Sequence, residues 1–286
     1  MERNHDLPVG EAPVFEFQDV SFAYPGDQPA LDRVNLTVRA GESLAILGAN
    51  GSGKSTVLKL MDGLYFPTGG TLLAFGRPLT ERALEEDAVN FDFRRRVGLL
   101  FQDSDVQLFS PTVFDEVAFA PLQTDWPRAE VIERVESALR ALRIEKLRDR
   151  PPHRLSGGEK RRVALASILS LNPAVWLLDE PSAGLDPRSQ SWLEDFMVDQ
   201  VRVGKTIVTA THDLALAEVV ADRICVFNEA HQLVADGRPA EILFNQDLLA
   251  NCNLIHEHRH PDTGAGAEHS HPHIHHPSHE HSHRSE

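Results

Sequence analysis

The 286-residue chain is 41% hydrophobic and 25% charged, which is typical of a folded unit with a sizeable core, alone or with an appendage. Asp and Glu total 43 against 28 Lys and Arg, giving a formal charge of −15. This acidic balance argues against a broad surface for nucleic acid. No uninterrupted apolar run approaches the roughly 18 residues of a membrane-spanning helix, so a role at a membrane would need another chain to cross it.

The first predicted elements are short antiparallel strands. Apolar and polar residues alternate from Val14 to about Leu47, with turns at Pro25-Gly26 and Ala40-Gly41. An amphipathic helix is predicted after residue 56, because apolar residues then recur at i, i+3, i+4 and i+7. These residues are Val57, Leu60, Met61 and Leu64.

The segment between that strand and helix predicts a phosphate-binding loop. Its glycines let backbone N–H groups turn toward a polyphosphate, Lys54 can reach the outer phosphates, and the Ser55 hydroxyl is placed to bind Mg²⁺. An ordinary glycine turn is the alternative, but the order strand, loop, helix favours a nucleoside triphosphate site. The predicted ligand contacts are Gly48, Asn50, Gly51, Ser52, Gly53, Lys54, Ser55 and Thr56.

The middle of the chain alternates helices with apolar strands. Residues 128–149 and 160–171 keep apolar residues at helical spacing. The apolar runs 175–178 and 206–210 predict buried strands on either side of a helix near residues 189–203. This alternation predicts an α/β fold built around a parallel sheet.

Two adjacent carboxylates, Asp179 and Glu180, follow the run 175–178. A buried strand would deliver them to the carboxyl edge of the sheet, where α/β folds bind ligands. We expect Asp179 to hold Mg²⁺, mainly through its water shell, and Glu180 to polarise the water that attacks the γ-phosphorus. A solvated turn before Pro181 is the alternative.

Three further motifs are ambiguous when taken singly. Leu155-Ser156-Gly157-Gly158-Glu159 offers N–H groups and a serine hydroxyl to an anion, but it is equally a helix cap. His212, after the strand at 206–211, is more often a structural residue in such a place. Gln102 and Tyr24 alone would be ordinary surface residues.

Taken in order, these motifs resemble those of ABC-type ATPases over residues 14–227. The matches are residues 48–55 to the Walker A loop, Gln102 to the Q-loop glutamine, residues 155–159 to the signature motif, residues 175–180 to the Walker B strand, residues 182–186 to the D-loop, His212 to the switch histidine, and Tyr24 to the ring that stacks on adenine. Glu159 stands where the family most often has Gln, a change also found in related subfamilies, so we still expect an active site.

The resemblance implies a P-loop NTPase (RecA-like) core with an antiparallel β subdomain and an α-helical signature subdomain. The ATPase domain would span residues 14–245, with the helical subdomain at about 103–158, followed by a short extension at 246–255. Two chains would pair head to tail and hold ATP between the Walker loop of one and Ser156 and Gly158 of the other. One sequence leaves open whether the pair is homomeric or heteromeric.

In that arrangement the resemblance assigns roles to the remaining residues. Glu180, His212 and Gln102 would surround the γ-phosphate as catalytic residues. Ser55, Gln102 and Asp179 would be the Mg²⁺ ligands. Hydrolysis would reopen the dimer and so turn bond chemistry into movement.

The C-terminal residues 256–286 contain eleven histidines and almost no large apolar groups, a composition that predicts a disordered tail. Neutral imidazoles suit Ni²⁺ and Co²⁺, and alternating His-x-His spacing offers several of them at once. A solvated low-complexity end or an added purification tag is the alternative.

Within the family, residues 97–109 and 111–119 resemble the ATPase subunits of energy-coupling-factor importers, especially those for cobalt and nickel, and residues 236–243 resemble their regulatory extension. In that group a membrane subunit docks on the helices after the Q-loop. We therefore expect the ATPase of a nickel or cobalt importer, bound to permease subunits at the cytoplasmic face of the cell membrane, with reduced thiols at Cys225 and Cys252. A vitamin or other metal cargo, a soluble non-transport ABC ATPase, and a metal store or sensor are the alternatives.

Overall fold

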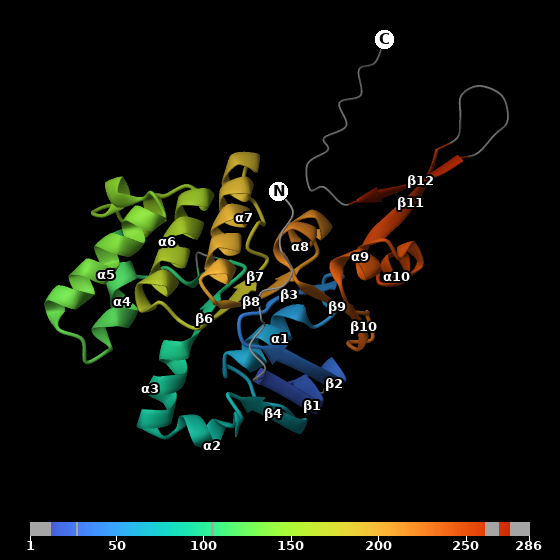
Figure 1. The fold of residues 1–286 in the computed structure, drawn as a ribbon, viewed down its shortest axis with the longest axis horizontal. Coiled ribbons are helices and arrows are strands. Elements are labelled where there is room, and N and C mark those ends of the chain that lie inside the picture. Colours follow the sequence, from blue (N-terminus) through green and yellow to red (C-terminus); the bar gives the residue numbers. More distant parts are fainter. Residues whose placement is uncertain (1–12, 27, 104–105, 261–268, 275–286) are drawn as a thin grey trace, which may run out of the picture.

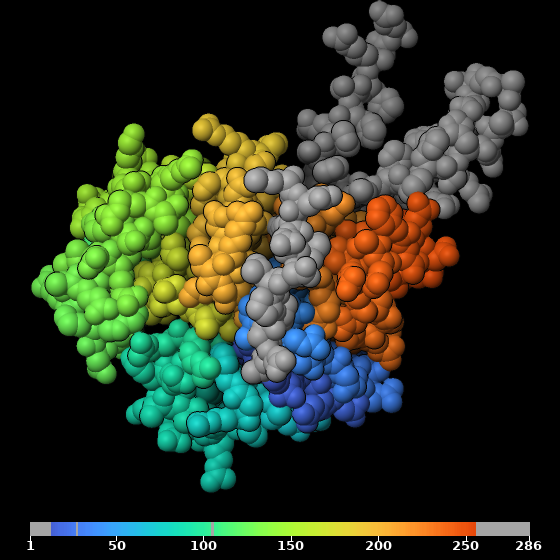
Figure 2. Space-filling view, in the orientation of Figure 1, coloured from blue at the N-terminus to red at the C-terminus, as the bar shows by residue number. Residues whose placement is uncertain are grey.

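The computed structural model describes residues 13–26, 28–103, 106–260 and 269–274. An antiparallel sheet, a larger mixed sheet and a cluster of helices lie side by side, with a C-terminal group of short elements at the opposite end from the helical cluster (Figure 1). In the space-filling view, the helical cluster, coloured green to yellow, forms one end of the molecule, and the antiparallel sheet lies along its lower side (Figure 2).

The antiparallel sheet has the strand order β2-β1-β4-β5. Its strands are β1 (Pro13–Tyr24), β2 (Gln28–Arg39), β4 (Gly69–Ala74) and β5 (Arg77–Pro78). The antiparallel prediction is confirmed, but β1 and β2 are 12 residues long rather than short. Irregularities in their register, such as the one between Phe17 and Val20, interrupt the alternation that the sequence analysis used to delimit strands.

The larger sheet has the order β10-β9-β3-β8-β7-β6. Its strands are β3 (Ser43–Gly48), β6 (Val97–Leu100), β7 (Val175–Asp179), β8 (Thr206–Thr211), β9 (Arg223–Phe227) and β10 (Leu233–Gly237). All neighbouring pairs are parallel except β9 with β10. The α/β prediction is therefore confirmed, and the carboxyl ends of β3, β7 and β8 meet at one edge.

The helices lie around this sheet. They are α1 (Lys54–Met61), α2 (Glu81–Leu84), α3 (Asp87–Arg96), α4 (Val113–Leu122), α5 (Arg128–Ala141), α6 (Gly157–Leu171), α7 (Pro187–Arg202), α8 (Leu214–Val220), α9 (Pro239–Leu243) and α10 (Gln246–Asn251). Short 3₁₀ turns occur at Glu145–Leu147 and Pro152–Arg154. Among the described residues no helix has the length and apolarity needed to cross a bilayer.

Two helix ends differ from the predicted spacing. The first helix ends at Met61, before Leu64, whose side chain is 43% exposed. The helix predicted from Lys160 begins three residues earlier, at Gly157. Ser156 and Glu159 form a reciprocal capping box there, which supplies the hydrogen bonds that the first turn lacks.

The central strand β7 contributes to two apolar cores. Trp176 and Leu178 pack in the core formed with α4, α5, α6 and α7. Val175 and Leu177 pack in the core shared with α1 and the antiparallel sheet. Because successive strand residues face opposite sides, covering both faces requires the uninterrupted apolar run seen in the sequence.

The chain ends in a two-stranded antiparallel sheet formed by β11 (Ile255–His260) and β12 (His269–Ile274). The prediction of a disordered tail from residue 256 differs from the structure over these strands, because composition does not register the period of two in their sequences. Residues 261–268 and 275–286 of the predicted tail lie outside the described residues. Cys225 and Cys252 are both buried and free of disulfides.

Candidate functional site

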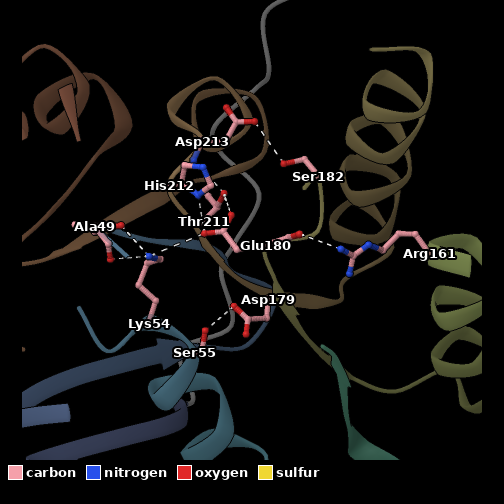
Figure 3. Close-up of polar contacts among 11 residues, drawn as sticks. Ala49, Lys54, Ser55, Arg161, Asp179, Glu180, Ser182, Thr211, His212 and Asp213 are labelled. Atoms are coloured by element: carbon pink, nitrogen blue, oxygen red, sulfur yellow. Dashed lines mark hydrogen bonds and ion pairs between the residues drawn. The ribbon is translucent and has the colours of Figure 1, made fainter. Parts of the chain in front are cut away.

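The phosphate-loop residues lie between β3 and α1, and Lys54 is the buried cation among them (Figure 3). Its Nζ donates to the carbonyl oxygens of Gly48 at 2.8 Å and Ala49 at 3.0 Å. It also lies 4.0 Å from Oε1 of Glu180. Burial lowers the pKa of Lys54, and the Glu180 and Asp179 carboxylates oppose that effect. This group therefore holds a positive charge next to two carboxylates.

The backbone of this loop requires glycine at its tightest points. Gly53 has a φ of 108°, and a Cβ there would lie 2.4 Å from the carbonyl oxygen of Ala30. A Cβ on Gly48 would lie 2.4 Å from Oγ of Ser52. Larger residues would displace the loop from the start of α1.

Two observations on this loop fit a bound phosphate. No side chain caps the N-terminus of α1, so its first N–H groups and the positive end of the helix dipole are available to an anion. The Ser52 hydroxyl is buried and has no hydrogen-bond partner within the described chain. A buried polar group of this kind needs a partner, and a phosphate oxygen could supply one.

Ser55 and Asp179 form the oxygen-rich side of the site. The Ser55 hydroxyl donates to Oδ1 of Asp179 at 3.0 Å (Figure 3). Burial raises the pKa of Asp179, while this hydrogen bond opposes the rise. A hydroxyl and a carboxylate suit Mg²⁺, which takes one or two protein oxygens and completes its shell with water and substrate phosphates.

Glu180 lies at the carboxyl end of β7 with both carboxylate oxygens engaged. Oε2 accepts from the Thr211 hydroxyl at 2.9 Å, and Oε1 accepts from Nδ1 of His212 at 2.8 Å. The hydrogen bond to Glu180 raises the pKa of His212, with burial acting against it. The structure therefore brings together Glu180 and His212, which the sequence placed on different strands, and adds Thr211, which the sequence analysis did not single out.

The other predicted residues border this group. The Tyr24 hydroxyl lies 3.0 Å from Oγ1 of Thr56, in the second residue pair after Lys54. The Gln102 side chain is exposed, and its backbone oxygen accepts a hydrogen bond from the α6 helix. Ser156 bonds Glu159 in its own helix start. A Cβ on Gly158 would lie 3.7 Å from Oγ of Ser189, so the signature residues belong to the helical layer.

Arg161 is a second residue that the sequence analysis missed as part of the site. It lies in α6, is 5% exposed, and donates to the backbone oxygens of Phe101, Gln102 and Glu180. Its partners are 60, 59 and 19 residues away. The only sequence signal was a pair of arginines after the signature motif, which also suits a solvated helix face.

Known proteins resemble this chain over most of its length. A family model described as ABC transporter matches residues 31–183. A putative ABC transporter ATP-binding protein of Caldanaerobacter subterraneus subsp. tengcongensis is 52% identical over 242 residues, covering 85% of this chain and 99% of the relative. The nickel import ATP-binding protein NikO of Rhodobacter capsulatus is 48% identical over 246 residues, covering 85% of this chain and 96% of the relative.

A solved structure has the same fold. It is cbiO1 from Clostridium perfringens, described as part of the ABC transporter complex cbiONQ. The TM-score is 0.73 at 34% sequence identity, and the match covers 85% of this chain and 96% of that chain.

Proposed function

This chain belongs to the ABC transporter family as an ATP-hydrolysing importer subunit, and from that membership we propose that it powers the uptake of nickel or cobalt ions through a separate permease. The observation that carries the proposal is the Lys54, Ser55, Asp179, Glu180 and His212 group at one sheet edge. The cargo assignment is supported by the 48% identity with a nickel import protein.

The described residues divide the steps of ATP hydrolysis among them. We expect Lys54 to leave the carbonyls of Gly48 and Ala49 for the β- and γ-phosphate oxygens. Mg²⁺ bound at Ser55 and Asp179 would neutralise charge on those phosphates. The Glu180 carboxylate would orient and polarise the attacking water, while His212 holds that carboxylate in place.

The site is proposed to be completed by a second chain. The signature residues Ser156 and Gly158 lie at the start of α6, where helix N–H groups and a serine hydroxyl suit a phosphate. By resemblance they would contact ATP held by the Walker loop of the partner, and Gln102 would join the Mg²⁺ site as the dimer closes. Tyr24 would stack on the adenine.

A membrane partner is proposed to dock on the helical layer at an apolar patch formed by Phe109, Phe119 and Leu122. The rings of Phe109 and Phe119 contact each other edge to face, with centroids 4.9 Å apart. Leu122 follows Phe119 by one helical turn in α4, and all three side chains are exposed. Clustered exposed apolar groups of this kind mark interaction surfaces, and this patch follows the Q-loop, where the resemblance places the permease contact.

The membrane role can be tested by replacing Phe109 with aspartate. We expect Phe109→Asp to stop integral membrane proteins from copurifying with the tagged full chain, and to lower nickel or cobalt accumulation by cells roughly tenfold. ATP binding should be unchanged, because the patch lies outside the Lys54 group. The matched control is Phe244→Asp, since Phe244 is 82% exposed in another part of the molecule. Equal copurification and accumulation by both variants would contradict the docking proposal.

We further propose that the histidine-rich tail binds Ni²⁺ or Co²⁺ before transport. Imidazole nitrogens suit these ions. The backbone register of β11 and β12 places three pairs of histidines at directly opposite positions, namely His256 with His273, His258 with His271, and His260 with His269. Alternate strand positions share a face, so this register supports a ligand-rich face on the two-stranded sheet.

The register gives a specific test of the tail. We expect His258→Ala combined with His271→Ala to weaken Ni²⁺ binding by the full chain roughly tenfold, because the remaining ligands lose a chelating pair. The matched control, His281→Ala with His283→Ala, removes two histidines outside the strands and should have a smaller effect. Calorimetric titration with Ni²⁺ measures both. Undiminished Ni²⁺ and Co²⁺ binding after deletion of residues 256–286 would overturn the proposal.

A further inference from the structure

Arg161 joins three backbone carbonyls that belong to different parts of the site (Figure 3). Its Nη1 donates to the oxygen of Phe101 at 2.8 Å. Its Nη2 donates to the oxygens of Gln102 at 2.9 Å and Glu180 at 3.3 Å. A guanidinium suits this task because its donors lie in one rigid plane.

These carbonyls lie at the ends of two neighbouring strands. Phe101 and Gln102 follow β6, Glu180 follows β7, and the two strands pair in parallel. Arg161 itself lies in α6, the helix that begins with the signature motif. One side chain therefore links the signature helix to both the Q-loop and the residue that carries the candidate catalytic carboxylate.

The Glu180 backbone needs such support. Its φ is +43°, a left-handed conformation that is unfavourable for a residue with a side chain. The N–H of Glu180 donates to the oxygen of Ala210 at 2.8 Å, and Arg161 holds the oxygen on the other side of the same residue. With Thr211 and His212 on the carboxylate, each polar part of Glu180 has a defined partner.

Burying Arg161 is unfavourable in itself. Desolvation lowers the pKa of Arg161, and the nearby Asp179, Asp103 and Glu180 carboxylates oppose that effect. A position needed only for packing would be filled at less cost by an apolar residue. The buried charge is retained where three carbonyls converge, which indicates a role in the site.

We propose that Arg161 is a positioning residue for ATP hydrolysis, which fixes the Glu180 carboxylate and the start of the Q-loop relative to the signature helix. The proposal rests on the ATPase activity of this chain. When α6 engages the nucleotide of the partner chain, the same guanidinium transmits the position of that helix to Glu180 and Gln102. Arg161 contacts neither water nor phosphate in this scheme and acts through the backbone alone.

The first test measures the steady-state ATPase kinetics of the full chain. We expect Arg161→Met to lower kcat about 100-fold, the loss typical of a misplaced catalytic group, with KM for ATP changed less than about twofold. Arg161→Lys should fall between the two, because one ammonium cannot reproduce the planar set of donors. The matched control is Arg162→Met, since Arg162 donates to the oxygen of Leu142 and stacks on Trp192 within the helical layer. It should keep kcat within about twofold of the wild type.

A second measurement separates positioning from a general structural role. If Arg161 acts through Glu180, Arg161→Met should lower the residual rate of the Glu180→Gln variant less than about threefold. Thermal unfolding of each variant identifies any loss of folding, in which case Arg161→Lys carries the same comparison. Wild-type kcat in both Arg161 variants, or losses that multiply fully in the double variant, would overturn the proposal. Wild-type turnover is measured alongside, so a failure of the ATPase assignment is distinguished from a failure of this proposal.

Discussion

Replacing Lys54 with alanine should weaken ATP binding on the order of 100-fold and abolish measurable hydrolysis. Lys54 is 6% exposed and is the buried cation nearest Glu180, at 4.0 Å. Its removal leaves the phosphates without a charge-assisted donor in a site where solvent cannot replace it. Binding can be measured with a fluorescent ATP analogue, and hydrolysis by phosphate release.

The matched control for this prediction is Lys59→Ala. Lys59 lies one turn further along α1, and its Nζ is 5.9 Å from the centroid of the Tyr65 ring rather than in the phosphate loop. We expect its ATP affinity to stay within about threefold of the wild type. A Lys54→Ala variant that binds and splits ATP like the wild type would remove the basis of the whole functional assignment.

Replacing Glu180 with glutamine should lower kcat roughly 1,000-fold while leaving ATP binding within a few-fold of the wild type. The amide has nearly the same shape but cannot polarise a water as a carboxylate does. Its NH₂ group would also face Thr211 and His212, which both donate to the native carboxylate. The two effects fall on the chemical step, so single-turnover phosphate release with Mg²⁺ and excess protein is the appropriate measurement.

The control for this variant is Glu218→Gln, an exposed carboxylate on α8. It removes the same charge from the chain without touching the site, and its turnover should match the wild type. Turnover by Glu180→Gln equal to that of this control would show that another group activates the water.

Local sequence was sufficient to predict the parts of the site that lie on one strand and the turn after it. The phosphate loop follows β3 directly, and Asp179 and Glu180 end β7. Their chemistry therefore depends on neighbours in the sequence and on the general geometry of parallel strands. The pairing of Glu180 with His212 needed only the additional expectation that both strands end at the same edge.

The contacts of Arg161 and Thr211 could not be predicted in this way. They depend on β6, β7 and β8 being adjacent in the sheet and on where α6 crosses them. A pattern of apolar residues does not fix strand order. The strand ends and helix starts also shifted by several residues, because caps such as the Ser156 and Glu159 pair decide them.

The hydrogen bonds between Lys54 and its own loop have a consequence for the transport cycle. The carbonyl oxygens of Gly48 and Ala49 compete with any phosphate for the same ammonium. An incoming nucleotide must displace them, so net affinity is the difference between two sets of bonds rather than the full strength of one. After cleavage the ammonium can return to these oxygens, which lowers the barrier to product departure and favours turnover over tight retention.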